Sequence, residues 1–440
     1  MLSRVAAHNA RLNHFIRIDA EGALARARAL DAHQAAGGEL GPLHGVPVAH
    51  KDMYYRAGRV STCGSRIRAD YRPDITSTLL ERLDAAGAVE LGALNMTEFA
   101  IGPTGHNAVW GNARNPWNTE HITGGSSSGS GGAVAAGMAF ASIGSDSGGS
   151  VRLPAGICGV VGLKPTLGRL SMYGGMGISF SIDTPGPLTR TVADSARVLG
   201  VLAGHDPRDP YCADRPVPDY EAGIGREIAG LRIGRPRNHF YEHCTAELKR
   251  LLDDSLRVFE HLGAEIVDVD APECEHMMEL SRAVLYPEGA ALHAQWLREC
   301  PEDYSPQVRV RVATGFGIPA PVYLEALHMR PRIVRQFVET VFGSCDVLHT
   351  PLLSFPVPTL KETDIGSSDA MWEVIGRLCH STAPFNYLGL PAMTVPAGFT
   401  GNGLPASFQL IAPSFEEALL FRAAAAYETE SAWRDTHPEL

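Results

Sequence analysis

The stretch ITGGSSSGSGGAVAAGMAFASIGSDSGGSVRLPAGICGVVGLKPTLGRLSMYGGM, at residues 122–176, decides the fold. Glycine and serine succeed one another densely here, with Ala-rich and Val-rich pieces between them. The stretch is too apolar for a flexible linker and contains no run of charge. Because glycine allows close backbone approach and positive φ, we predict a tightly packed core segment whose backbone lies close to a neighbouring element or a ligand.

Helix and strand patterns alternate on both sides of this segment. Helical patterns occupy 1–36 (ended by Gly37-Gly38), 74–87 (with Asp74 or Thr76 near the N-cap), 191–204, 246–263, most of 275–340, and 414–428. Short apolar runs at 46–49, 88–96, 231–236, 264–270, 393–399 and 406–412 predict strands. The alternation predicts an α/β fold in which the Gly/Ser-rich segment and the last strands share one sheet. With no internal repeat or boundary signal, we expect a single domain over residues 1–440, with residues 1–36 as an N-terminal helical segment.

Bulk composition narrows the class of protein. The chain has 440 residues, a formal net charge of -11 and 45% hydrophobic residues, so it is a globular protein without the basic surface that nucleic acid requires. Eight cysteines without a CxxC pair or zinc spacing predict free thiols and no metal. The N-terminus lacks a signal-peptide pattern and no apolar run is long enough to span a bilayer, so we expect a cytoplasmic protein without membrane contacts.

The segment GPLHGVPVAHKD, residues 41–52, ends an apolar strand on a lysine. Lysine is rarely buried without a partner, and burial lowers its pKa enough for it to act as a base. Lys51 is therefore a candidate general base. The alternative is an ordinary strand-end lysine that reaches solvent or pairs with Asp52.

The segment GGSSSGSGG, residues 124–132, allows several interpretations. It lacks the Gly-Lys-Ser/Thr ending of a phosphate loop and fits a dinucleotide fingerprint poorly. Residues 125–129 match the G-x-S-x-G nucleophile elbow with Ser127 at its centre, an interpretation that needs a downstream histidine such as His349 or His380. A structural turn is the plainest alternative.

The segment GSDSGGSVRLP, residues 144–154, places Ser150 directly after two glycines. Unobstructed backbone N–H groups beside a serine can form an oxyanion hole, although a tight turn explains the same pattern. Asp146 is a candidate to hold this loop and Arg152 to brace it.

Together these three segments resemble the amidase signature family. Further matches are NPWN (115–118), DTPGPLTRTVAD (183–194) and PFNYLGLPAMTVPAGF (384–399), so that the resemblance covers about residues 8–430. It implies a large mixed β-sheet covered by helices on both faces, and a Ser-cisSer-Lys triad. Carried over by position, Lys51 is the motif lysine, Ser126 the serine on the cis peptide, and Ser150 the nucleophile.

The chemistry of these residues agrees with the resemblance. A serine hydroxyl needs an adjacent base, and neutral Lys51 would draw the proton of Ser150 through Ser126 without any metal or cofactor. We expect the N–H groups of Ser147, Gly148, Gly149 and Ser150 to stabilise the oxyanion, and Ser127 to support the relay. His50 stands where the family usually has an aliphatic residue, and we expect it to be a packed or hydrogen-bonded core histidine.

Four functions are compatible with these patterns. The first is an amidohydrolase that cleaves a small amide, anilide or urea- or biuret-like compound, which the short N-terminus favours. The second is the glutaminase subunit of a tRNA-dependent amidotransferase. A non-catalytic ligand-binding relative and an esterase with Ser127 as nucleophile are the others. We expect the pocket to be lined by segments around 100–110, 285–330 and 350–385, and a homodimer is the default assembly.

Overall fold

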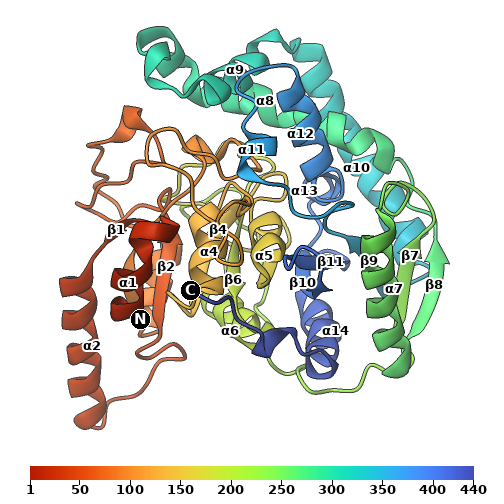
Figure 1. The fold of residues 1–440 in the computed structure, drawn as a ribbon, viewed down its shortest axis with the longest axis horizontal. Helices are drawn as coiled ribbons and strands as arrows, with labels where there is room; N and C mark the ends of the chain where they lie inside the picture. Colours follow the sequence, from red (N-terminus) through yellow and green to blue (C-terminus); the bar gives the residue numbers. More distant parts are fainter.

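The computed structural model describes residues 1–440 and is organised around one mixed sheet of eleven strands (Figure 1). The strand order is β1-β3-β2-β4-β6-β5-β10-β11-β9-β7-β8. The strands are β1 (Phe15–Ile18), β2 (Pro47–Lys51), β3 (Val89–Leu94), β4 (Ala141–Asp146), β5 (Val161–Lys164), β6 (Thr184–Thr189), β7 (Arg232–Pro236), β8 (Glu265–Val269), β9 (Val347–Pro351), β10 (Ala392–Phe399) and β11 (Pro405–Ile411). As predicted, the Gly/Ser-rich segment and the last strands share this sheet, because β5 pairs antiparallel with β10.

Fourteen α-helices surround the sheet. They are α1 (Leu2–Leu12), α2 (Ala20–Ala35), α3 (Thr78–Ala85), α4 (Ser128–Ala135), α5 (Arg152–Cys158), α6 (Val192–Leu202), α7 (Ala246–His261), α8 (Cys274–Glu299), α9 (Pro306–Thr314), α10 (Ala320–Phe342), α11 (Leu360–Thr363), α12 (Ala370–Cys379), α13 (Ala383–Leu388) and α14 (Glu417–Glu430). The α/β fold predicted from the sequence is confirmed.

Strand β5 shows why both faces of the sheet are covered. Val161 and Leu163 point into the largest apolar core, which α6 and α14 also line. Gly162 faces the opposite way, where a Cβ would lie 2.4 Å from that of Ala155 in α5. Because successive side chains of a strand point to opposite faces, the small residue lets α5 approach closely while its neighbours fill the other core.

The parallel pairing of β2 with β4 determines where the site lies. Adjacent parallel strands end at the same edge of a sheet, so the last residues of β2 and β4, Lys51 and Asp146, lie near each other. Helices α8, α9, α12 and α13 contribute residues to the cavity at this edge, and Figure 1 shows α8, α9 and α12 gathered on that side of the molecule.

Two local expectations were wrong. The segment 1–36 is not continuous helix, because Asn13 adopts the left-handed conformation that ends α1 and Phe15–Ile18 then pairs with β3 at the sheet edge. Helix α3 is capped by Ser77, whose hydroxyl accepts the N–H of Leu80, and neither Asp74 nor Thr76 serves as its cap. None of the helices combines the length and apolar character needed to cross a bilayer.

Candidate active site

Lys51 lies at the end of β2 and is completely buried. Its ammonium nitrogen Nζ donates to two hydroxyl oxygens, that of Ser126 at 2.7 Å and that of Ser145 at 2.9 Å. Asp52 instead accepts hydrogen bonds from the backbone and side chain of Thr62. The alternative of a solvent-reaching or Asp52-paired lysine is therefore wrong.

The protonation state of Lys51 follows from this setting. Burial lowers its pKa from 10.5 to about 7, and the nearby carboxylates of Asp183 and Asp146 oppose the shift. A large part of the Lys51 population is therefore neutral at neutral pH and has a lone pair that can accept a proton.

Ser126 lies just before α4 and follows a cis peptide bond at Gly125–Ser126. Its hydroxyl is buried and faces Lys51. Ser127 is also fully buried, but its hydroxyl pairs with the backbone of Ser145, donating to the carbonyl at 3.3 Å and accepting the N–H at 3.2 Å. Ser127 thus ties the loop before α4 to β4, the strand that carries Ser145.

The loop that carries Ser150 is held by an ion pair beneath it. Asp146 binds the Arg152 guanidinium at 3.0 Å and accepts the N–H groups of Gly149 at 2.7 Å and Val151 at 3.1 Å. Burial alone would raise the pKa of Asp146, but Arg152 and the hydrogen bonds from Arg152 and Asn386 hold it well below its usual range. The carboxylate therefore stays charged and fixes the loop, which is the role expected of Asp146 and Arg152 from the sequence.

Backbone donors near Ser150 differ in their availability. The N–H groups of Ser147, Gly148 and Ser150 donate to no protein acceptor, whereas the N–H of Gly149 is engaged by Asp146. The expectation that Gly149 supplies an oxyanion donor is therefore corrected to three candidate donors. Gly149 instead serves the turn, since its φ of 125° is one that side-chain-bearing residues rarely adopt.

Ser150 is brought to the same place as Lys51 and Ser126, although its side chain is not linked to them by a hydrogen bond. It is 8% exposed and lines the cavity, and its carbonyl accepts the N–H of Ser127 at 3.3 Å. Catalytic hydrogen bonds of ligand-free enzymes are often long and tighten only when substrate binds.

Two residues of this site were not predicted from the sequence. Ser145 shares Lys51 with Ser126, and Asp183 accepts a hydrogen bond from the hydroxyl of Ser147. Burial raises the pKa of Asp183 even though hydrogen bonds from Ser147 and the backbone at 178–179 lower it. From the sequence, Ser145 could have been recognised as a serine inside a buried strand, directly before the Asp146 loop.

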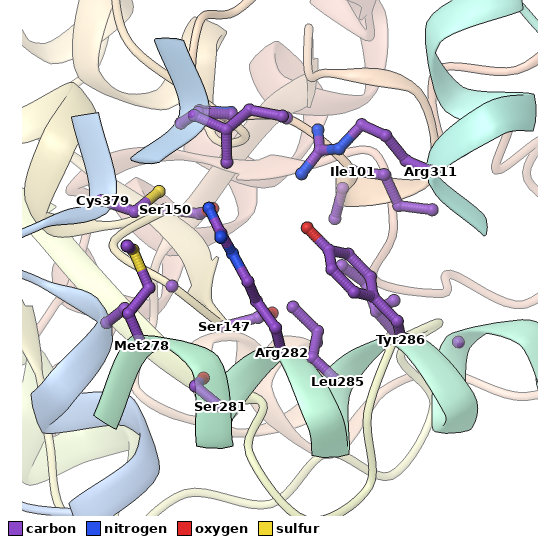
Figure 2. A pocket seen from close by; sticks show the side chains of 18 of the residues that line it. Ile101, Ser147, Ser150, Met278, Ser281, Arg282, Leu285, Tyr286, Arg311 and Cys379 are labelled. Carbon is purple, nitrogen blue, oxygen red and sulfur yellow. The ribbon is translucent and has the colours of Figure 1, made fainter. Parts of the chain in front are cut away.

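A cavity opens in front of Ser150 (Figure 2). Its lining comes from the segment 100–103, from α8, α9, α12 and α13, and from the loop with Ser147, Gly148 and Ser150. The further lining side chains are Ala100, Ile101, Pro103, Ile178, Met278, Ser281, Arg282, Leu285, Tyr286, Arg311, Val312, Ile375, Cys379 and Ala383. The three expected segments are thus represented, although the part of α8 before residue 285 contributes as well.

His349 and His380, the histidines that the nucleophile-elbow interpretation requires, bind elsewhere in the protein. His349 contacts the hydroxyls of Tyr241 and Ser255, and His380 contacts the backbone carbonyl of His239, so neither reaches Ser127. The esterase alternative lacks the base it requires. His50 is buried, with Nε2 3.2 Å from a carboxylate oxygen of Glu90, as expected of a hydrogen-bonded core histidine.

All eight cysteines are free thiols. No group of three or more His, Cys, Asp or Glu side chains is arranged to hold a metal ion.

A buried lysine bonded to a serine, beside a glycine-flanked second serine with free N–H donors, is the constellation of a serine amidase. The family model described as Amidase matches residues 1–421. The chain therefore belongs to the amidase family, the amidase signature enzymes, and is a hydrolase of carbon–nitrogen bonds. The presence of Lys51, Ser126 and Ser150 together argues against a non-catalytic binding role.

Individual relatives cover nearly the whole chain. The A subunit of glutamyl-tRNA(Gln) amidotransferase from Moorella thermoacetica (strain ATCC 39073 / JCM 9320) is 40% identical over 463 residues, covering 100% of this chain and 94% of the relative. Its counterpart in Roseiflexus sp. (strain RS-1) is 38% identical over 465 residues, covering 100% and 93%. A solved chain from a vestigial protein complex that reveals the evolutionary origins of an s-triazine catabolic enzyme is 34% identical, with a TM-score of 0.91 and coverage of 100% and 95%.

Proposed function

We propose that this protein hydrolyses a carboxamide through an acyl-enzyme on Ser150, with Ser126 and neutral Lys51 relaying the proton. The observation that carries the proposal is the 2.7 Å hydrogen bond between Lys51 Nζ and Ser126 Oγ in a fully buried setting. Burial makes the amine a base at neutral pH, and the hydroxyl beside it is the group through which that base acts.

The reaction proceeds in two halves. Ser150 Oγ attacks the carbonyl carbon while its proton passes to Ser126 and that of Ser126 passes to Lys51. The oxyanion accepts hydrogen bonds from the N–H groups of Ser147, Gly148 and Ser150. When the C–N bond breaks, the proton returns through Ser126 to the leaving nitrogen, which departs as ammonia or an amine. Water then attacks the ester through the same relay, giving the carboxylic acid and free Ser150.

The biological role that the relatives favour is that of a glutaminase subunit. The Moorella and Roseiflexus relatives both carry the name of a glutamyl-tRNA(Gln) amidotransferase component and match the whole chain. In that role the chain would release ammonia from glutamine for use by a partner protein. This reverses the preference that the short N-terminus suggested.

A stand-alone amidase for a small amide is the second candidate. The observation in its favour is that no acidic side chain lines the cavity, so that the ammonium group of glutamine would have no carboxylate partner there. The solved chain associated with an s-triazine catabolic enzyme favours a small-molecule substrate, although that chain comes from a protein complex and so does not favour a stand-alone enzyme. Free thiols support a location in the reducing cytoplasm for either role.

The decisive experiment for the proposed chemistry is labelling of the purified chain with a small fluorophosphonate, followed by peptide mass spectrometry. We expect the label on Ser150 and its loss in Ser150→Ala. Ser130→Ala is the matched control, because Ser130 is buried in α4 and its hydroxyl has no hydrogen-bond partner. A label on any other serine would overturn the assignment.

The glutaminase role and the stand-alone amidase role predict different substrates. Ammonia release from glutamine is compared with release of ammonia or amine from primary amides, anilides and biuret-like compounds. Faster turnover of glutamine supports the role in an amidotransferase, and turnover of a small amide without that of glutamine supports the stand-alone amidase.

A further inference from the structure

Glu288 is a buried carboxylate of α8 that does not line the cavity in front of Ser150. It is 3% exposed, and its two oxygens accept four hydrogen bonds, all from neutral groups. The donors are the hydroxyl of Ser179, the hydroxyl and N–H of Ser181, and the hydroxyl of Tyr323 in α10. Burial of a carboxylate is strongly unfavourable unless hydrogen bonds compensate it, so Glu288 requires these donors to stay in place.

Three of these four hydrogen bonds come from one short segment, residues 178–183, which leads into β6. Ser179 and Ser181 hold this segment to Glu288 from one side. From the other side, the carboxylate of Asp183 accepts the N–H of Ser179 at 3.0 Å, and the N–H of Asp183 donates to the carbonyl of Ser179 at 3.1 Å. The segment is therefore held between two carboxylates, and a shift of Ser179 would also move Asp183.

Asp183 connects this segment to the oxyanion donors. Its other carboxylate oxygen accepts a hydrogen bond from the hydroxyl of Ser147, whose own N–H has no protein acceptor. Ser147 lines the cavity together with Ser150. Consecutive hydrogen bonds through Ser179 and Asp183 thus link Glu288 to a candidate oxyanion donor. Such donors stabilise the transition state because they are held, before the reaction, at the place where the negative charge develops.

The wall of the cavity on α8 is fixed by the same contact. Gly289, the residue after Glu288, packs so closely against Ile178 that a Cβ would lie 3.0 Å from the Ile178 side chain. Both Gly289 and Ile178 line the cavity. Figure 2 shows Arg282 and Tyr286 of the same helix directed toward it. The contact between α8 and the segment 178–183 therefore sets the position of this wall relative to the oxyanion donors.

We propose that Glu288 is a positioning residue for the reaction: through Ser179 and Asp183 it holds Ser147 in the orientation that stabilises the oxyanion. The proposal rests on the proposed function in that the oxyanion forms where Ser150 attacks. It adds a residue outside the cavity on which the rate of that attack depends. Because Glu288 touches neither the substrate nor the nucleophile, its replacement should change the rate of acylation and leave both the affinity for a reagent and the protonation of the base unchanged.

The test is inactivation of the purified chain by a small fluorophosphonate at increasing concentrations, which separates the maximal rate from the half-saturating concentration. Glu288→Gln keeps the size of the side chain but presents an NH₂ group to donors that need an acceptor. We expect the maximal rate to fall about tenfold to a hundredfold, less than the roughly 10²–10³-fold effect of removing an oxyanion donor. The half-saturating concentration should stay as in wild type, and so should the rise of the rate near pH 7 that Lys51 sets.

A double-mutant cycle tests the connection between Glu288 and Ser147. Ser147→Ala removes the hydroxyl that is bonded to Asp183 and retains the N–H. If Glu288 acts through this hydroxyl, adding Glu288→Gln to Ser147→Ala should lower the maximal rate by no more than about threefold further. Losses that multiply in the double variant would show that the two residues act independently and would overturn the proposal.

Glu417→Gln is the matched control. Glu417 is also a buried glutamate, but its contacts are the N–H of Thr166 and the guanidinium of Arg169, away from the segment 178–183. Its maximal rate should equal that of wild type. Equal losses in the two glutamine variants, or a change confined to the half-saturating concentration in Glu288→Gln, would contradict the positioning role. If Glu288→Gln does not fold, Ser179→Ala, which removes one link, is measured in its place by the same criteria.

Two results distinguish this role from the proposed chemistry. Failure of the fluorophosphonate to label Ser150 in the wild-type chain would refute the chemistry itself. A wild-type chain that is labelled at Ser150, together with an unchanged maximal rate in Glu288→Gln, would leave the chemistry intact and refute only the role of Glu288.

Discussion

Replacement of Lys51 by methionine tests the central feature of the site. Methionine keeps most of the side-chain volume and removes the amine that is hydrogen-bonded to Ser126 and Ser145. The rate at which a fluorophosphonate acylates Ser150 is the appropriate assay, because it reports on the nucleophile without any knowledge of the substrate. Loss of a positioned general base lowers such rates by roughly 10²–10⁴-fold.

The pH dependence of the wild-type rate follows from the pKa of Lys51, which burial lowers to about 7. The base is the neutral amine, so the rate should rise with pH and level off above about pH 8. About half of the amine is neutral at pH 7 and roughly 1% at pH 5, so the rate falls about tenfold for each pH unit below the midpoint. A lysine with the ordinary pKa of 10.5 would still be gaining activity at pH 9.

Lys164→Met is the control for this experiment. Lys164 is the other fully buried lysine, and burial lowers its pKa to about 7 as well, but its Nζ donates to the carbonyl of Pro165 and contacts no serine. The rise of the rate near pH 7 should survive in Lys164→Met and disappear in Lys51→Met. A wild-type rate in Lys51→Met, or a profile that is flat between pH 5 and pH 9, would refute the relay.

Three further substitutions probe the surroundings. Ser145→Ala removes one of the two hydroxyls that hold Lys51, and the labelling rate should fall about fivefold, the effect of one ordinary hydrogen bond. Asp146→Asn breaks the buried pair with Arg152, so urea denaturation should show a loss of about 3–5 kcal/mol in the free energy of unfolding. Burial raises the pKa of Glu428 from 4.5 to about 7, so the folded state holds this proton more tightly and wild-type stability declines as pH rises between those values. Glu428→Gln should therefore be more stable than wild type by about 3 kcal/mol above pH 7 and equal to it below pH 4.5, as measured by urea titration at each pH.

Much of the fold was predictable because the periodicity of hydrophobic residues and the residue preferences of turns depend on residues that are close in sequence. The helix 246–263 and the strand 46–49 appear close to their expected limits as α7 and β2. The strand Phe15–Ile18 was missed because only its pairing with β3, distant in sequence, makes it a strand rather than a continuation of helix.

The candidate active site was only partly predictable from the sequence. Lys51, Ser126 and Ser150 were assigned on the family resemblance, and the structure brings Lys51 and Ser126 into contact. Ser145 gave no periodic signal because all six positions of β4 are buried, so its polarity did not mark a face. Gly149 was expected to supply an oxyanion donor, but its N–H donates to the carboxylate of Asp146, three residues earlier. The composition around Gly149 does not indicate the direction of this N–H.

Two buried arginines near Ser150 differ in whether their guanidinium groups have hydrogen-bond partners inside the protein. Arg152 is fully buried and every direction of its guanidinium is used, by Asp146, Asn386, Gln409 and a backbone carbonyl. Arg311 is nearly as buried and is bound by nothing in the protein. The charge of Arg152 is compensated by partners inside the fold, so that removing one of them would be strongly destabilising, whereas Nε of Arg311 is buried without such compensation. Arg152 therefore belongs to the scaffold beneath Ser150, whereas Arg311 lines the cavity in front of Ser150.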